Sequence, residues 1–450
     1  MKRCNAQLLI MLMAVVCSTN TRAAPSSEED DLALAYGDKS FVSIASGSMQ
    51  PIARAPSVAT VITAEDIAAI GSTDLDEVLE TVPGLHVSRS PILYNPIYII
   101  RGISTQYNPQ VLMLINGIPI TGVFVGNRSQ VWGGMPVENI ARIEVIRGPG
   151  SALYGADAFS GVINIITKTA TDIKGTEPGV RFGSFDSHDG WVQHGGKWGE
   201  IDTVLYLRAG HTDGQQQIIT ADRLTGAPYS LAPGPVNLSR DAIDGRLDLA
   251  YEKLRLRMGY QQRDNVGNGA GVASALDPAG KNFGERISTD LTYQDANFAP
   301  DWDVTAQASY LHITEQSDLV LFPPGTDLGT GPFPNGVIGN PAKWERHLRF
   351  NLAASYTRLQ NHKIRMGTGT QGDNLYRTRE TNNFSTGSPG PVVDVSNTTP
   401  FLRPHNRRVN YAYVQDEWGF TQDWYLTAGV RHDHYSDFGG TTNPRLALVW

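Results

Sequence analysis

The larger, C-terminal part of the chain alternates apolar and polar residues with a period of two, and this pattern restricts the fold more than any other feature. From about residue 179, segments such as 287–294 have one mainly apolar and one polar parity, and Leu254, Leu256, Met258 and Tyr260 repeat the pattern. Period two is the repeat of a β-strand with one apolar face. Many of these segments exceed the ~5–6 residues usual for globular strands. We therefore expect about eleven or twelve long strands before Trp450.

The links between the predicted strands alternate between tight and long. Tight links are expected at 252–253, 298–301, 360–362 and 421–423, and long links rich in Gly, Pro and Asn at 214–240, 264–284, 317–344 and 376–406. Outer-membrane barrels have this layout, with short periplasmic turns and long external loops. Beyond the N-terminal segment there is no run of about 18 apolar residues, so a membrane-spanning segment can only be a strand.

A soluble β-sandwich is the alternative, because its strands also alternate around a shared apolar core. Here the polar parity carries many Asp, Arg, Gln and Thr residues, which suit a water-filled lumen. Strand length and the alternation of link lengths also favour the membrane barrel over the sandwich.

Residues 1–23 have the features of a secretory signal. Lys2 and Arg3 give a positive start, 8–16 is an apolar run too short for a membrane anchor, and cleavage is expected after Ala23. A lipoprotein signal centred on Cys17 is the second interpretation, because the preceding Val16 is bulkier than lipoprotein processing usually accepts.

Composition excludes several classes of function. The only cysteines, Cys4 and Cys17, leave with the signal, so the mature chain has no disulfides, no catalytic cysteine and no cysteine-ligated metal. The net charge of -8, without a basic block, makes a nucleic-acid partner unexpected.

Residues 24–50 are predicted to be flexible, with an acidic run at 28–31. Within them lies a short β-favouring run with no obvious partner, made of Ser40, Phe41, Val42, Ser43, Ile44 and Ala45. It is either part of a linker or a strand that pairs with the sheet edge of another chain.

Residues 51–172 are expected to form a compact α+β domain. Thr63 and Asp66 have the spacing of a helix cap, and Pro83 with Gly84 ends a second short helix at 75–82. Strands are expected at 58–62, 96–101, 111–115, 140–147 and 161–167, with a turn at Asn116 and Gly117.

Four segments of this domain, at 76–85, 98–103, 111–119 and 143–167, resemble in sequence and order the plug signatures of TonB-dependent outer-membrane receptors. The sequences of these segments are most similar to those of the ferric-siderophore, colicin and cobalamin receptor branch. The resemblance implies a mainly β protein, a transmembrane antiparallel β-barrel at 178–450 with an N-terminal α+β plug domain at 51–172 in its lumen. Barrels of this family have about 22 strands, so the strands expected here form a partial barrel. We expect a C-terminally truncated chain or a fragment, the alternative being a small complete barrel.

The resemblance also implies a location in the outer membrane of a Gram-negative bacterium, in contact with its lipid. It implies import of a ferric siderophore or similar metal chelate, energised by TonB with ExbB and ExbD, and colicins or phages as further partners. Cobalamin, nickel-chelate or glycan import is the alternative of the same class. A passive porin, an adhesin or a non-functional fragment is the alternative from other classes.

Residue roles carried over from the resemblance fall into three sets. The TonB-box candidate is the run from Ser40 to Ala45 described above. Candidate ligand contacts at the two plug apices are Arg89, Tyr94, Asn95, Asn127, Arg128 and Trp132, because arginine suits an anionic chelate and aromatic rings suit its rings; packing against the barrel wall is the alternative. Plug structural residues are Arg101, Gly102, Arg147, Gly148, Tyr154, Gly155 and Asn164. Arg101 and Arg147 lie at the ends of apolar plug strands, where a buried arginine needs a carboxylate partner. The resemblance implies pairing with acids of the barrel wall across the lumen; the alternative is that the two arginines tie plug strands together.

Enzyme activity has no positive support in the sequence. There is no nucleophile elbow and no convincing pair of catalytic carboxylates, and no catalytic residue or cofactor is expected. His432 and His434 share one strand face, but two imidazoles make a weak metal site, so we expect solvated histidines and no metal.

Overall fold

The computed structural model describes residues 41–44, 50–90, 93–129, 131–421 and 423–450. The predicted signal at 1–23, the following residues to 39, and Ser40 and Ala45 of the TonB-box candidate lie outside the described residues.

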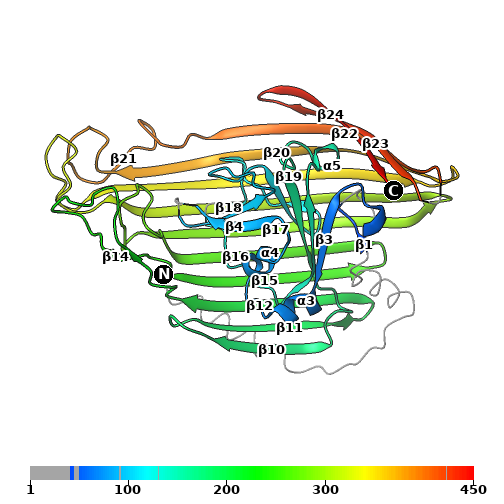
Figure 1. Ribbon diagram of the computed structural model, residues 1–450, viewed down its shortest axis with the longest axis horizontal. Helices are drawn as coiled ribbons and strands as arrows, with labels where there is room; N and C mark the ends of the chain where they lie inside the picture. The colour runs from blue at the N-terminus through cyan, green and yellow to red at the C-terminus, as the bar shows by residue number, and fades with distance from the viewer. Residues whose placement is uncertain (1–40, 45–49, 91–92, 130, 422) are drawn as a thin grey trace.

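A long antiparallel sheet forms the larger part of the molecule (Figure 1). Twelve strands follow one another in chain order across it, and the two-residue β21 (Val393–Asp394) joins only β20. The twelve strands are β10 (Gly175–Phe182), β11 (His188–Trp198), β12 (Ile201–Thr212), β15 (Arg240–Tyr251), β16 (Leu254–Gly267), β17 (Lys281–Ala299), β18 (Trp302–Phe322), β19 (Val337–Tyr356), β20 (His362–Asn382), β22 (His405–Gly419), β23 (Tyr425–Tyr435) and β24 (Gly439–Val449). The predicted partial barrel of eleven or twelve strands is confirmed. Within the described residues no ladder joins β10 to β24, so the sheet is an open, curved wall.

The two ends of the wall differ as the link lengths predict. Residues 199–200, 252–253, 300–301 and 357–361, with the short link between β22 and β23, form short turns at the end where β24 stops in Figure 1. Residues 213–239, 268–280, 323–336 and 383–404 form the long loops at the opposite end, and the first of them contains β13 (Ile218–Ile219) and β14 (Gly234–Pro235). Three of the long loops are shorter than predicted, because the strands on either side of them, β16 to β20 and β22, continue into the segments expected to be loops.

The two faces of the wall have opposite character, as β19 illustrates. Leu348, Phe350 and Leu352 are about half exposed on the outer face, whereas Glu345 and His347 are fully buried on the inner face. A strand that crosses lipid needs this inversion, with apolar side chains outward and polar side chains toward the lumen.

The N-terminal α+β domain, called the plug below, is built on a five-stranded sheet in the order β3-β8-β9-β6-β7. Its elements are β1 (Phe41–Val42), β2 (Gln50–Pro51), η2 (Ile52–Arg54), β3 (Val58–Thr63), α3 (Ala64–Ile70), α4 (Leu75–Glu80), β4 (Leu85–Arg89), β5 (Pro96–Ile100), β6 (Val111–Ile115), β7 (Ile118–Pro119), β8 (Ile140–Arg147), α5 (Ser151–Tyr154) and β9 (Gly161–Thr167). Thr63 and Asp66 form the predicted capping box of α3.

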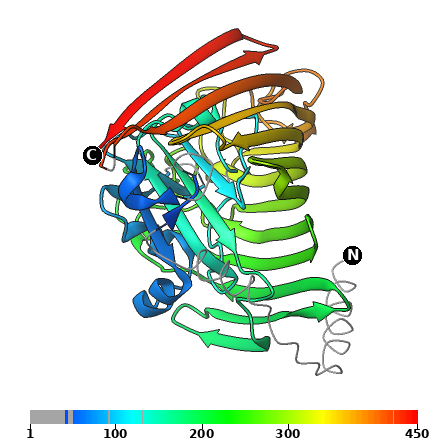
Figure 2. The same cartoon turned by 90° about the vertical axis from the view of Figure 1, so that its right-hand side faces the viewer.

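The plug packs against the concave face of the wall (Figure 2). Its main core joins α3 and α4 to the sheet through buried side chains such as Ile67, Leu75, Met113, Ile143 and Ile163. Burial of each such side chain contributes about 1.5–3 kcal/mol, so this small domain has its own core. The plug is therefore a folded insert in the space that the wall curves around.

Candidate functional site

The described part of the TonB-box candidate, Phe41–Ile44, is docked on the plug. β1 pairs antiparallel with β2, with Phe41 opposite Pro51 and Val42 opposite Gln50. Val42 and Ile44 are 0% and 3% exposed and belong to a second core cluster with plug residues such as Leu114 and Val162. The segment therefore has a partner within the chain, which its sequence did not reveal.

The buried carboxylate of Glu144 binds the backbone of this segment. Oε2 of Glu144 on β8 accepts hydrogen bonds from the Ser43 N–H (3.0 Å), the Ser43 hydroxyl (2.8 Å) and the Ile44 N–H (3.0 Å). Its other oxygen, Oε1, lies 2.7 Å from Nη2 of Arg142, and the two side chains are 0% and 1% exposed. Hydrogen bonds to an ionised acceptor contribute about 1.5–3 kcal/mol each. Glu144 is thus positioned to fix the backbone of a segment 100 residues earlier in the chain.

The start of the plug lies against the wall at the end of the short turns. The guanidinium of Arg54 stacks over the ring of Tyr425, 4.7 Å from its centre, at the first residue of β23. Arg445 on β24 donates hydrogen bonds to the Pro56 carbonyl (3.1 Å) and the Ser57 hydroxyl (2.9 Å). The docked segment therefore lies at the short-turn end of the wall, the end that faces the periplasm in outer-membrane barrels.

Two of the six candidate ligand residues, Arg128 and Trp132, are buried at 2% and 6% exposure. Arg128 stacks over Tyr98 at 4.6 Å and donates to Oδ1 of Asn108 at 2.9 Å. Trp132 donates its indole N–H to the Tyr98 hydroxyl at 3.0 Å. Both side chains therefore support the plug from inside. Their contact with a ligand stays a prediction, and their burial does not favour it.

Of the other four candidates, two are buried and two keep accessible surface. Asn95 and Asn127 are buried, and their backbone carbonyls accept hydrogen bonds from the Ser90 and Gly122 N–H groups. Arg89 is exposed and forms a 2.8 Å ion pair with Asp76. Tyr94 is half-buried and packs against Gly269 in a long loop, where a Cβ would lie 2.8 Å from its ring. Arg89 and Tyr94 therefore keep surface that a ligand could reach.

A buried ladder of charged side chains on the wall holds the second plug apex, at 122–132. Lys343 Nζ lies 2.8 Å from Oε1 of Glu345 and 3.1 Å from Oε2 of Glu315. Oε2 of Glu345 accepts a 2.6 Å hydrogen bond from the Val123 N–H, and Oε1 of Glu315 is paired with the Ser129 hydroxyl. Further along, His347 Nδ1 lies 2.6 Å from Oδ1 of Asp373 on β20.

None of these wall residues was predicted as a site residue. The alternation of charges on one parity of β19, from Lys343 through Glu345 and His347 to Arg349, was the available signal. Which plug atoms they meet depends on the docking of two domains, so no local pattern could reveal it.

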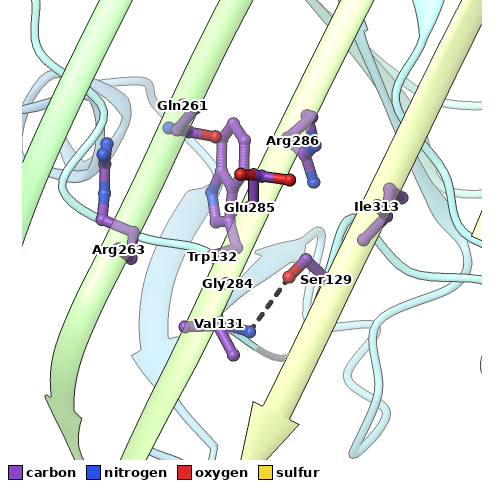
Figure 3. Close-up of a pocket in the computed structure, with 9 residues that line it drawn as sticks. All are labelled: Ser129, Val131, Trp132, Gln261, Arg263, Gly284, Glu285, Arg286 and Ile313. Atoms are coloured by element: carbon purple, nitrogen blue, oxygen red, sulfur yellow. Dashed lines mark hydrogen bonds between the residues drawn. The ribbon is translucent and has the colours of Figure 1, made fainter. Parts of the chain in front are cut away.

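A small cavity lies between the plug apex and the wall (Figure 3). It is lined by Ser129, Val131 and Trp132 of the plug and by Gln261, Arg263, Gly284, Glu285, Arg286 and Ile313 of β16 to β18. Its volume of about 10 Å³ suffices for roughly one water molecule. Arg263 also donates to the Gly133 and Gly134 carbonyls at 3.1 and 3.0 Å. This junction is a packed interface, too small to bind a chelate.

The arginines assigned to the plug framework have neither the burial nor the carboxylate partners expected for them in the described residues. Arg101 is exposed and lies against Gly148. Arg147 is half-buried; it donates to the Pro83 carbonyl and, at 3.1 Å, to the Thr60 hydroxyl. Arg147 thus ties plug segments together, one of the two alternatives considered. Arg101 is not buried as predicted, because its positive φ of 53° turns the chain out of β5 before the side chain can enter the core.

The remaining framework residues shape turns and close contacts. Gly102, Gly148 and Gly155 have φ of 76°, 138° and 85°, which L side chains rarely adopt. Oδ1 of Asn164 accepts a 2.9 Å hydrogen bond from the Gly117 N–H, so it fastens the turn between β6 and β7. Tyr154 packs against the same cluster as Val42 and Ile44.

No group of three or more His, Cys, Asp or Glu residues in the described ranges is arranged to hold a metal ion. His432 and His434 are exposed on the outer face of β23, and Nδ1 of His432 lies 2.8 Å from the Thr442 hydroxyl. Among the described helices, none has both the length and the apolar character needed to cross a membrane.

Comparison with known proteins identifies both parts of the chain. The family model for the TonB-dependent receptor plug domain matches residues 51–162, and that for the TonB-dependent receptor-like β-barrel matches residues 179–450. An iron-regulated outer membrane virulence protein of Vibrio cholerae is 25% identical over 92% of the chain, and the chain spans 57% of its length. The vitamin B12 transporter BtuB of Vibrio vulnificus is 38% identical over 136 residues, which are 30% of the chain and 22% of the transporter.

Solved structures share the fold at low identity. The siderophore receptor PirA of Acinetobacter baumannii has a TM-score of 0.61 at 19% identity, over 87% of this chain and 58% of its own. The copper transporter OprC has a TM-score of 0.62 at 16% identity, over 87% and 59%. The family is one of transport receptors, and both of its characteristic parts are present here. The chain, with a plug on the inner face of a β-barrel wall, belongs to the TonB-dependent receptors.

Proposed function

We propose that this protein acts in the outer membrane of a Gram-negative bacterium and imports a ferric siderophore or a similar metal chelate, energised by TonB with ExbB and ExbD. One observation carries the proposal: a short β-strand at the periplasmic end of the plug is docked by β1–β2 pairing and by three hydrogen bonds to Glu144. Release of this segment as a unit has to break these hydrogen bonds and expose Val42 and Ile44, and the freed strand can then add to a sheet edge of TonB.

The plug supports import over passive diffusion. A porin needs an open lumen, whereas here a folded domain lies on the inner face of the wall and is tied to it from Pro56 to Val123. Transport past such an insert requires the insert to move, which is work that an external energy source must supply.

Ligand capture is proposed at the side of the long loops. Arg89 and Tyr94 are the two candidates with reachable surface, and Tyr94 already touches a long loop at Gly269. Asn95, Asn127, Arg128 and Trp132 would support the apices from within. An exposed arginine suits an anionic chelate, and an accessible aromatic ring suits the aromatic or conjugated groups of that chelate.

Cobalamin is the second candidate ligand. The stretch of 38% identity to a vitamin B12 transporter, over 136 residues, favours it. Siderophores stay first because similarity to the iron-regulated protein extends over 92% of the chain.

Growth of a strain that lacks this gene tests the proposal. Under iron limitation the strain is grown on a panel of ferric siderophores, and separately in a cobalamin-dependent background. Loss of growth on one iron chelate, restored by the gene, supports the first candidate, and loss on cobalamin alone supports the second. Growth equal to that of the parent on every compound would contradict both.

A further inference from the structure

The outer face of the wall carries a patch of arginines and aromatic rings near the long loops, which the proposed function does not use. We define the outer-face patch as His312 on β18, Trp344 and Arg346 on β19, and Tyr376 and Arg377 on β20. On β19 the buried residues Lys343, Glu345 and His347 face inward, so Trp344 and Arg346 between them face outward.

The patch is an organised cluster. The Arg377 guanidinium lies 4.4 Å from the ring centre of Trp344, and that of Arg346 lies 5.1 Å from the ring centre of Tyr376. The Tyr376 hydroxyl lies 3.0 Å from Nε2 of His312. A register shift between β19 and β20 pairs Trp344 with Arg377 but Glu345 with Leu375. This bulge turns both Tyr376 and Arg377 outward, where regular alternation would send one of them into the lumen.

Neither arginine forms an ion pair with a carboxylate among the described residues, and both are exposed. This differs from the inner face of the same strands, where Lys343 contacts two carboxylates. Arg408 on β22 is a third exposed arginine on the outer face nearby. The two arginines of the patch therefore carry positive charge without a paired carboxylate, while the Glu285 carboxylate on β17 interacts electrostatically with His312.

The height of the patch places it at a membrane boundary. Trp302, Tyr356 and Trp418 mark the short-turn end of β18, β19 and β22, and they contact neighbouring rings there. His312, Arg346 and Arg408 each lie about ten residues further along the same strands. At ~3.3 Å per residue and a tilt of ~40°, ten residues rise about 25 Å, the height of the apolar band of outer-membrane barrels. The exposed Leu348, Phe350 and Leu352 fill this interval.

We propose that the outer-face patch binds the phosphate groups of an anionic lipid in the outer leaflet. The planar guanidinium groups match phosphate oxygens in pairs, Trp and Tyr rings favour the headgroup level, and stacking on these rings holds both arginines at the surface before a lipid arrives. The inference rests on the outer-membrane location of the proposed function, but not on the identity of the imported ligand.

Lipid retention by the purified full-length protein tests this site. The protein is equilibrated in neutral detergent with lipid A, a diphosphorylated glycolipid, or with its dephosphorylated form, and bound lipid is measured by native mass spectrometry. The double variant R346Q/R377Q is compared with wild type and with R358Q, which removes an exposed arginine at the short-turn end. A charge-preserving R346K/R377K variant controls for folding.

We expect about a tenfold weaker retention of the phosphorylated lipid in R346Q/R377Q, with partial retention in R346K/R377K and none of this loss in R358Q. Retention of the dephosphorylated lipid should not change, and millimolar inorganic phosphate should not displace the lipid. Equal retention of both lipids, or equal retention by wild type and R346Q/R377Q, would overturn the site. Import of the chelate should persist in R346Q/R377Q, so failure of the lipid site and failure of the transport proposal are distinguishable.

Discussion

Glu144 accepts hydrogen bonds from both the backbone N–H and the hydroxyl of Ser43, 101 residues earlier in the chain, through a single carboxylate oxygen. The other oxygen is occupied by Arg142. This relationship joins the strand proposed to meet TonB to the central sheet of the plug.

The variant Glu144→Gln should loosen the docked segment. A neutral amide keeps the shape but replaces charge-assisted hydrogen bonds with weaker ones, each worth about half as much. With Phe41→Cys as a label site in a mature chain free of other cysteines, maleimide should react several-fold faster in E144Q. Glu138→Gln is the matched control, because Glu138 contacts Arg181 and Tyr206 on the wall and not the docked segment. Equal labelling rates in E144Q and the parent would argue against Glu144 as the group that holds the docked segment.

The variants Val42→Pro and Phe41→Pro should stop import and leave ligand binding intact. Proline removes a strand hydrogen-bond donor that pairing with another sheet needs. The measurement is uptake of a radiolabelled chelate beside its binding to whole cells, with Val42→Ile as the control that keeps the N–H. Import at the parental rate in both proline variants would remove the case for this strand as the coupling segment.

The variant Gly161→Ala should destabilise the plug. A Cβ at Gly161 on β9 would lie 2.6 Å from the Ile146 carbonyl oxygen and 2.5 Å from Cδ1 of Ile100. The backbone carbonyl cannot move without disturbing the central sheet, so we expect a loss of about 1–3 kcal/mol in the free energy of unfolding. Urea unfolding in detergent measures it, and Gly190→Ala, where no heavy atom lies within 4 Å of the new Cβ, should change little. A urea concentration at the unfolding midpoint of G161A that equals or exceeds the value for G190A would refute the prediction.

Asp222 should tie two long loops together in a pH-dependent manner. Partial burial opposes its ionisation, but backbone N–H groups of Leu276 and Leu224, both at 2.9 Å, outweigh burial and hold the pKa of Asp222 below its usual value. A lowered folded-state pKa means that the stabilisation is present above the unfolded-state pKa of about 4 and is lost as pH falls through the folded value.

Hydrogen exchange at 213–239 should therefore be slow at pH 7 and rise, after correction for intrinsic rates, below about pH 4. Asp222→Asn should show fast exchange in this loop already at pH 7. The control is Asp318→Asn, at an exposed position on β18. Unchanged protection in D222N at pH 7 would show that the loops are held together by other contacts.

Much of the architecture was predictable because its causes are local. Period-two alternation predicted the strands and their number, and the turn chemistry predicted which links are short. The capping box at Thr63 and Asp66 and the strands β8 and β9 lie where the sequence placed them. The lengths of the loops after β16, β18 and β20 were overestimated, since the strands continue into segments without clear alternation.

Which residues meet across the domain boundary was decided only by the tertiary structure. A sequence pattern shows that Glu144 and Glu345 lie on strands, but not that one accepts from Ser43 and the other from Val123. Arg128 matches a ligand contact by residue type, yet its stacking on Tyr98 places it inside the plug. The sequence alone determined the strands, the turns and the family, since these depend on neighbours in the chain. The contacts of Glu144 with the docked segment, the charged wall residues around Lys343 and the outer-face patch depend on strand register and domain docking. These bring together groups that lie from 2 to 222 residues apart in the chain.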